Sequence, residues 1–456
     1  MFQIIACLVI FALCICLYIW NKLPISIVAL LGLGLMILTN VISFSDAVSN
    51  FASSTVFLIV CMMVVGRAAF DTGLAQKVGG VIVKISKNNE RLVVTLATLL
   101  TGLLSAFLSN VATLAMMISI VTGICSANKK IRFKNVVMPM SMAAVLGGAA
   151  TLIGSTPQLT ANGLLTTFFG DTATELGTEV TQFTFFTFSI PGFIILALTT
   201  LYVAFIGYPL GKKIWGNRDD YEEIPTIQNS GEEKVYKKSK MIIMALIFVL
   251  MILAFISSDV LTNLNKTYKW FAKMPAFFNI GSISLVFALL CILTGCITPK
   301  DAGKAINWRL AVWFAASLGM ASGLAKSGAA DMIADWFSNI NVHPYAVFAI
   351  FMVLIVALTQ FLSNSTVLAI VMPIAFAITK SLDTSMGFMY YSYPIAIGLT
   401  MAGAIAVATP LANATIGMSM TANYKFKDYL LYCGPVTLMA LAVVLIAIPI
   451  MYPVFF

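Results

Sequence analysis

The sequence predicts an all-α polytopic membrane protein of about ten full spans, made of two inverted repeats that each contain a re-entrant hairpin and a broken transmembrane helix. The first observation is composition: 60% of the 456 residues are hydrophobic and 10% are charged, whereas a soluble domain carries about 25% charged residues. The second is a set of apolar runs long enough for spans of ~20 residues. The third is a series of short motifs that recurs in the same order in both halves of the chain.

These recurring motifs define the two repeats. We expect the first repeat at residues 1–210 and the second at residues 241–456, with almost no insertions between them. The linker at residues 211–240 is rich in Lys, Glu and Asp, which predicts a solvated cytoplasmic segment. The matched pairs are Asp46-Ala47 with Asp301-Ala302, Gly73 with Gly328, Phe107–Asn110 with Phe361–Asn364, and Thr156-Pro157 with Thr409-Pro410, at offsets of 255, 255, 254 and 253 residues.

The elements follow the same order in each repeat. Three spans come first, an apolar stretch with Ser-Asn near its middle follows, and two more spans close the repeat, the first of them interrupted by Gly and Pro. Basic loops flank the first Ser-Asn stretch on both sides, so both of its ends are expected in the cytoplasm and the stretch is predicted to be a re-entrant hairpin. An odd number of crossings per repeat inverts the second copy and places both termini outside. The expected ranges are 3–20, 24–43, 53–70, 92–125 (hairpin) and 136–165 (broken helix), then 241–258, 279–297, 309–324, 344–379 (hairpin) and 388–422 (broken helix).

Charge and cysteine content exclude several classes of function. The formal net charge is +9, but Lys and Arg gather in loops between apolar runs, which is the positive-inside asymmetry of a multi-pass protein of the cell membrane rather than a nucleic-acid-binding surface. The eight cysteines lie in or beside apolar runs without metal-ligand spacing, so no cofactor is expected. A membrane enzyme would need a nucleophile and base or a carboxylate pair, and the single histidine, His343 in a loop, does not supply one.

Candidate binding groups lie at the hairpin tips and at the helix breaks. A hydroxyl residue precedes each Ser-Asn tip by one helical turn, Ser105 in the first repeat and Thr359 in the second. An interrupted span exposes backbone carbonyls at one half-helix end and amides at the other. Carbonyl, hydroxyl and amide oxygens suit Na⁺, whereas helix N-termini suit an anion. The sequence therefore indicates a site for a cation and an anion at mid-membrane depth.

The predicted hairpins and broken spans contain no Asp, Glu, Arg or His. Proton pumps and antiporters retain such groups inside the membrane as their working parts. The pattern therefore favours a carrier that couples to a metal cation over one that relays protons. A channel is a further alternative, although paired hairpins fit a gated carrier better than an open pore.

At these residues the chain resembles the divalent anion:sodium symporter family, within the ion transporter superfamily. Members of that family carry one Ser-Asn-Thr signature per repeat at a hairpin tip, each followed by a broken span. The resemblance implies a homodimeric elevator carrier in the lipid bilayer that moves a small di- or tricarboxylate, of C4-dicarboxylate type, together with Na⁺ as the coupling ion. It implies Na⁺ ligands at Ser105, Ser109, Asn110, Gly154, Thr359, Ser363, Asn364 and Ala408, and substrate contacts at Asn110, Val111, Ser155, Thr156, Asn364, Ser365, Thr409 and Pro410.

Two departures from the family pattern leave the substrate open. The first signature reads Ser-Asn-Val, so that Val111 lacks a hydroxyl, whereas the second reads Ser-Asn-Ser and keeps one at Ser365. The break loops read Ser-Thr-Pro-Gln and Ala-Thr-Pro-Leu in place of paired prolines. The alternatives are a carrier of another oxyanion, such as sulfate, arsenite or citrate, and an anion exchanger that needs no cation gradient.

Overall fold

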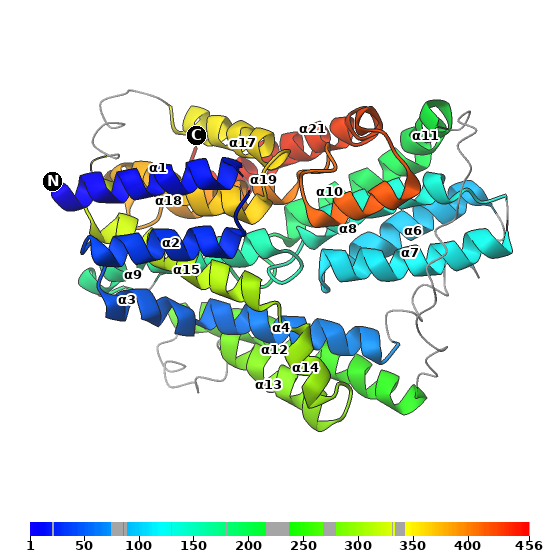
Figure 1. The fold of residues 1–456 in the computed structure, drawn as a ribbon, viewed down its shortest axis with the longest axis horizontal. Helices are drawn as coiled ribbons and strands as arrows, with labels where there is room; N and C mark the ends of the chain where they lie inside the picture. The colour runs from blue at the N-terminus through cyan, green and yellow to red at the C-terminus, as the bar shows by residue number, and fades with distance from the viewer. Residues whose placement is uncertain are drawn as a thin grey trace.

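The computed structural model describes residues 1–20, 22–73, 85, 89–128, 130–178, 180–215, 237–267, 280–330, 332 and 343–455. Across these residues the secondary structure is helical throughout, with no strand. The helices lie roughly along one axis, and both chain termini lie toward the same end of the molecule (Figure 1). The all-α architecture with two hairpins and two broken helices is confirmed, and the linker at 211–240 falls mostly outside the described residues.

The first repeat supplies the helices up to α11. They are α1 (Phe2–Trp20), α2 (Ile25–Leu38), α3 (Phe44–Ser49), the 3₁₀ turn η1 (Asn50–Ala52), α4 (Ser54–Asp71), α6 (Glu90–Ser105), α7 (Asn110–Ala127), α8 (Phe133–Gly148), α9 (Thr156–Glu175), α10 (Ser189–Tyr202), the π turn η2 (Val203–Gly207) and α11 (Tyr208–Trp215).

The second repeat repeats this order. It contains α12 (Lys238–Thr267), α13 (Ile280–Leu293), α14 (Pro299–Ala305), α15 (Trp308–Lys326), α17 (Pro344–Thr359), α18 (Asn364–Met386), α19 (Ser392–Ala404), α20 (Ala414–Met418), the 3₁₀ turn η5 (Ser419–Ala422) and α21 (Phe426–Met451). Within the described residues, four continuous helical segments are long and apolar enough to cross a membrane by themselves, at 44–71, 189–215, 238–258 and 426–451. The count of ten spans stays a prediction, because several of the remaining apolar helices are shorter.

Local chemistry explains why two of the matched motifs recur. Asp46 and Asp301 each donate a backbone N–H to the side chain of an N-cap residue, Ser43 at 3.1 Å and Thr298 at 3.1 Å, and so open the equivalent short helices α3 and α14. Gly73 and Gly328 follow the equivalent helices α4 and α15 with φ of +78° and +77°. Only glycine adopts this left-handed conformation without strain, so it ends both helices.

The two hairpins have the same turn. Four residues separate α6 from α7 and α17 from α18. The N-cap residue of the outgoing helix is Ser109 in one hairpin (φ −56°, ψ 130°) and Ser363 in the other (φ −55°, ψ 129°). This agreement confirms the match of the Phe-Leu-Ser-Asn motifs at the level of the backbone.

The second helix break differs from the sequence expectation. The first break runs from the end of α8 at Gly148 to the start of α9 at Thr156, whereas the second runs from Ala404 to Ala414 and so extends beyond Pro410. The Thr151 hydroxyl donates to the carbonyl of Ala106 at the first hairpin tip, and the Thr409 hydroxyl makes the same bond to the carbonyl of Gln360 at the second. Thr409 therefore corresponds to Thr151, at an offset of 258 residues, and the expected match of Thr156-Pro157 with Thr409-Pro410 is wrong.

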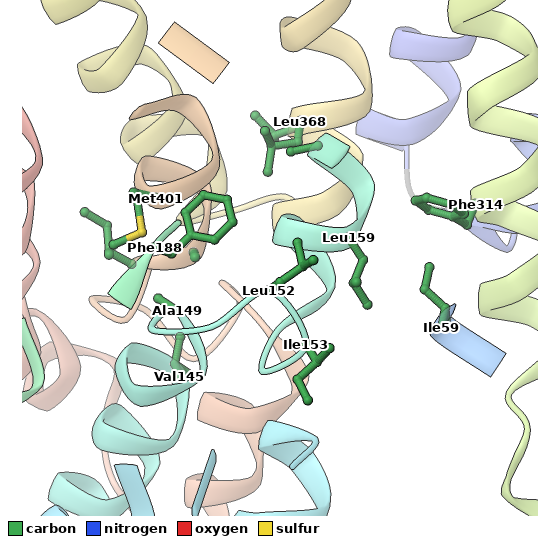
Figure 2. Packing of buried hydrophobic residues seen from close by; sticks show 14 of the residues in the cluster. Ile59, Val145, Ala149, Leu152, Ile153, Leu159, Phe188, Phe314, Leu368 and Met401 are labelled. Atoms are coloured by element: carbon green, nitrogen blue, oxygen red, sulfur yellow. The ribbon is translucent and has the colours of Figure 1, made fainter. Parts of the chain in front are cut away.

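Backbone groups at the first break are satisfied by neighbouring segments. The Leu152 N–H donates to the carbonyl of Phe185 at 3.1 Å, and the Ser189 hydroxyl donates to the carbonyl of Ala150 at 2.8 Å. Figure 2 shows Leu152 packed near Leu159 of α9, in a region lined by apolar side chains. An irregular backbone is tolerated at membrane depth only inside protein or beside water, and the burial of this segment inside the protein meets that condition.

The repeats interlock in a symmetric way. Helix α2 packs against α15 and α13 packs against α4, which are equivalent contacts because α2 matches α13 and α4 matches α15. The hairpin helix α6 packs closely on α8, where a Cβ added at Gly147 would overlap the backbone of Gly102. Glycine allows this close approach of two helices.

Candidate functional site

One cavity of about 650 Å³ collects the residues from both repeats. Its lining includes both hairpin tips and both helix breaks, with further residues from α1, α2, α4 and α15. Asn110 and Asn364, which lie 254 positions apart in the sequence, both line it. The fold thus brings the two Ser-Asn tips to a shared site, as the sequence predicts.

Most of the expected site residues line this cavity, and four do not. Ser109, Asn110, Val111, Gly154, Ser155, Thr156, Ser363, Asn364, Ser365 and Pro410 are among the lining residues. Ser105, Thr359, Ala408 and Thr409 lie behind this lining and are buried.

In the first repeat, oxygen atoms converge on the Asn110 amide. One atom of this amide lies 2.7 Å from the Ser105 hydroxyl oxygen, 2.9 Å from the carbonyl oxygen of Gly154 and 3.2 Å from that of Ala144. In one orientation of the amide this atom is Oδ1, which accepts a hydrogen bond from Ser105; in the other it is Nδ2, which donates to all three oxygens. Nδ2 at this position satisfies all three oxygens, whereas Oδ1 would face two carbonyl oxygens with no proton between them, an arrangement of oxygens that a bound hard cation would stabilise.

Two glycines leave room for this arrangement. A Cβ added at Gly148 would overlap the Asn110 amide. A Cβ added at Gly154 would lie 2.8 Å from the carbonyl oxygen of Ala106 and 3.0 Å from that of Ser105. The sequence predicts a span interrupted by Gly and Pro, and the structure adds a steric reason for glycine at both positions.

The equivalent region of the second repeat is arranged differently. The Thr359 hydroxyl turns back to donate to the carbonyl of Ile355 at 2.7 Å, within its own helix. Asn364 is 8% exposed, and its Oδ1 is buried without a hydrogen-bond partner. The Gln360 side chain accepts from the Ala408 N–H at 3.0 Å, so this backbone amide is already used. An unpartnered buried acceptor costs free energy unless a ligand satisfies it.

Three helices of eighteen residues or more begin at the cavity without a capping bond. The N-cap residues of α7, α9 and α18 are Ser109, Ser155 and Ser363, and none of their hydroxyls accepts from its own helix. Serine and threonine do cap other helices, for example Ser43 at α3 and Thr298 at α14. An uncapped N-terminus carries about half a positive charge and free N–H groups. These three helix starts are therefore available to an anion.

No Asp, Glu, Lys, Arg or His is among the described residues that line the cavity. Positive potential there comes from helix starts, and hydrogen bonds come from hydroxyls and amides. The remaining wall is apolar for the most part, formed by Ile25, Ile59, Met62, Met63 and Leu310 together with Tyr18.

Six lining residues in and just after the second break were not expected from the sequence: Leu411, Ala412, Asn413, Ala414, Thr415 and Gly417. Asn413 is the N-cap of α20, just as Ser155 is the N-cap of α9. A signal for this register is present, because Ala150-Thr151 matches Ala408-Thr409 and places Ala412 opposite Gly154. The repeated Thr-Pro pair gave a competing and misleading alignment.

Comparisons with known proteins agree with this geometry. The sequence model of a family described as citrate transporter matches residues 15–389. A transporter of Haemophilus influenzae is 26% identical over 404 residues, covering 86% of this chain and 81% of the relative. The sodium-dependent dicarboxylate transporter SdcS of Staphylococcus aureus is 22% identical over 419 residues, covering 86% and 76%.

A solved structure supports the fold independently. The crystal structure of the YdaH transporter of Alcanivorax borkumensis superposes with a TM-score of 0.57 over 90% of this chain and 89% of that one, at 11% identity. The family match covers most of the chain, and these relatives are transporters. The chain therefore belongs to the citrate transporter family, and it is a multi-pass transporter of the cell membrane, of the divalent anion:sodium symporter type, and not an enzyme.

Proposed function

We propose that this protein is a Na⁺-coupled carrier that moves a di- or tricarboxylate, with a C4-dicarboxylate as the first candidate. The observation that carries the proposal is the shared cavity, in which both hairpin tips and both helix breaks meet and whose described lining includes no ionisable acid, lysine, arginine or histidine. The similarity to a sodium-dependent dicarboxylate transporter supports the choice of ion and substrate.

The first cation site is proposed at the Asn110 amide. Its ligands are the oxygens of Ser105, Ser109, Asn110 and Gly154, three of which belong to residues that line the cavity. The Ser105 hydroxyl and the Gly154 carbonyl lie 2.7 and 2.9 Å from one atom of the Asn110 amide, and a cation would bind with the amide turned so that Oδ1 faces it.

The second cation site is proposed around Asn364, with Thr359 and Ser363. The resemblance assigns its last ligand to Ala408, but Ala412 is the better candidate because it occupies the position of Gly154. The unpartnered Oδ1 of Asn364 is the oxygen that a cation would satisfy.

The anion is proposed to bind between the two cation sites. Asn110, Val111, Ser155, Thr156, Asn364, Ser365 and Pro410 line the cavity and are the proposed contacts, whereas Thr409 is buried behind the lining and is not among them. Uncapped helix starts stabilise an anion, and bound Na⁺ further lowers the free energy of placing the anion's negative charge in the membrane.

Transport is proposed to follow an elevator mechanism in a homodimer. The hairpins are tied to the half-helices that follow them: Glu90 of α6 accepts from the Arg132 N–H at 2.9 Å, and Asp383 of α18 accepts from the Tyr391 N–H at 2.6 Å. Hairpins and broken helices thus form connected units, whereas the wall from α2, α4 and α15 is apolar and suits sliding.

Uptake into proteoliposomes tests the proposal. An inward Na⁺ gradient is expected to drive accumulation of labelled succinate, because cation and anion bind together. A matched K⁺ gradient is the control, and citrate and sulfate are tested as alternative substrates. Equal uptake under K⁺ would refute coupling, and no uptake of any of these anions would refute the substrate class.

A further inference from the structure

Hydroxyl side chains are distributed unequally between the two sides of the cavity. The tip of α18 carries two hydroxyls, Ser365 and Thr366, where the tip of α7 has Val111 and Ala112. These positions are equivalent, because both pairs directly follow the tip asparagine. The serines before that asparagine, Ser109 and Ser363, are the same in both repeats and do not distinguish them.

At the helix breaks the first repeat, rather than the second, carries the additional hydroxyls. The start of α9 carries two hydroxyls, Ser155 and Thr156, where the start of α20 has Asn413 and Ala414. The Asn413 side chain is already used: its Oδ1 accepts from the Ile416 N–H at 3.0 Å, and its Nδ2 donates to the carbonyl of Ala406 at 3.0 Å. Because α20 has five residues, its dipole is also small. The hydroxyls therefore concentrate on α9 and α18.

Helices α9 and α18 lie side by side and run in the same direction from the cavity. They pack along their length, and Phe168 and Phe376, about three turns beyond each start, have ring centroids 5.5 Å apart. In Figure 1 both helices lie in the half of the molecule opposite to α6 and α7. Two of the three uncapped helix starts, with four hydroxyls between them, thus form one side of the cavity, whereas the third, that of α7, carries Val111 and Ala112 on the other side.

A buried polar group on this side has no protein partner. Thr366 lines the cavity, is 2% exposed, and its hydroxyl makes no hydrogen bond. On the other side, Val111 is 43% exposed and lines the cavity with Leu411 and Ala414; Thr415 of α20 also lines it, but its hydroxyl is not one of the buried oxygens without a hydrogen bond. The unpartnered hydroxyl marks where a carboxylate is expected, and Val111 marks where it is not.

We infer that the site requires one carboxylate, held by α9 and α18, and accepts an uncharged group at the other end of the substrate, beside Val111 and Ala414. This inference rests on the proposed function and narrows its substrate class. Anions with a single carboxylate and an uncharged, weakly polar end are substrates alongside dicarboxylates of the same length. Val111 is then a residue that determines specificity.

Binding of three ligands that share one four-carbon backbone tests the inference. Dissociation constants are measured on the purified protein in Na⁺ for succinate, monomethyl succinate and dimethyl succinate, which carry two, one and no carboxylates. The first two are expected to bind within about tenfold of each other, and the diester is expected not to bind. A site built for two carboxylates would reject the monoester by roughly a hundredfold or more, and a loss beyond about tenfold overturns the inference.

Two isosteric substitutions locate the carboxylate. Val111→Thr adds a hydroxyl and is expected to shift preference toward succinate by about tenfold, with Val111→Ser as the substitute if the protein does not fold. Thr366→Val removes the unpartnered hydroxyl. It is expected to weaken the binding of both succinate and monomethyl succinate by about tenfold without lowering the melting temperature. An unchanged ratio in the Val111 variants, or a Thr366→Val effect on succinate alone, contradicts the inference.

The same measurements separate this inference from the proposed function. If succinate and monomethyl succinate bind equally well in K⁺ and in Na⁺, coupling to Na⁺ is refuted, but the inference of a single carboxylate site is not. If succinate binds and the monoester does not, the inference of a single carboxylate site is overturned, but the proposal of a dicarboxylate carrier is not. No binding of any carboxylate in Na⁺ overturns both.

Discussion

At the scale of single residues, the surroundings of a side chain decide its role in this site. Asn110 and Asn364 occupy the same position in hairpins of the same backbone conformation. One amide contacts three oxygens, whereas the other has a buried Oδ1 without a partner. The sequence predicts both asparagines at the site, but not this difference, because it depends on atoms of α8 and of the break that are distant in the chain.

Substitution of the two asparagines should separate their structural and functional roles. Asn110→Ala and Asn364→Ala are each expected to abolish Na⁺-driven uptake. Asn110→Ala should also cost about 1 kcal/mol of stability because it removes hydrogen bonds, whereas Asn364→Ala removes an unsatisfied atom and should not. Uptake and melting temperature of the purified variants measure this, and intact transport in either variant would remove that residue from the site.

Gly148→Ala tests whether the Asn110 position matters for the cation. The added Cβ would overlap the Asn110 amide and displace it, so the thermal stabilisation by Na⁺ is expected to disappear. Gly123→Ala in α7 is the matched control, since no atom lies within 4 Å of its added Cβ, and it should respond to Na⁺ as the native protein does. A normal Na⁺ response in Gly148→Ala would place the cation elsewhere.

At the scale of elements, the sequence predicts the hairpins well and the second break poorly. The Ser-Asn turns are local, and their four-residue motif recurs at one offset, so they can be located without a structure. The breaks are defined by long-range bonds, such as that from Thr409 to Gln360, and these leave little trace in sequence. A Thr-Pro pair starts a helix in the first repeat and lies inside the loop in the second, which explains the error.

An acid at the base of each hairpin holds it to the next half-helix. Asp383 accepts from the Tyr391 N–H and from the Ser392 hydroxyl, at 2.6 and 2.5 Å. Asp383→Asn is expected to cost about 1–3 kcal/mol, because it removes the negative charge from a carboxylate that accepts several hydrogen bonds. The melting temperature measures this against Glu175→Gln, an exposed site at the end of α9 where little change is expected. Equal melting temperatures would show that Asp383 does not hold the hairpin.

In the whole molecule, two interlocked copies surround a cavity whose described lining residues include no Asp, Glu, Lys, Arg or His. Repeat symmetry brings four short motifs together from distant parts of the chain, which explains why order and spacing of the motifs predict the fold class. Symmetry does not extend to side chains, since hydroxyls concentrate on α9 and α18. The substrate therefore has to be read from the structure of the cavity rather than from the repeated signature.

A cation and an anion are proposed to bind this cavity together and to stabilise each other there. Calorimetric titration of the purified protein with succinate, in Na⁺ and in K⁺ at equal ionic strength, tests it most directly. We expect binding at least about tenfold tighter in Na⁺, and by linkage an equal effect of succinate on Na⁺ affinity. The same succinate affinity in both salts would contradict the account.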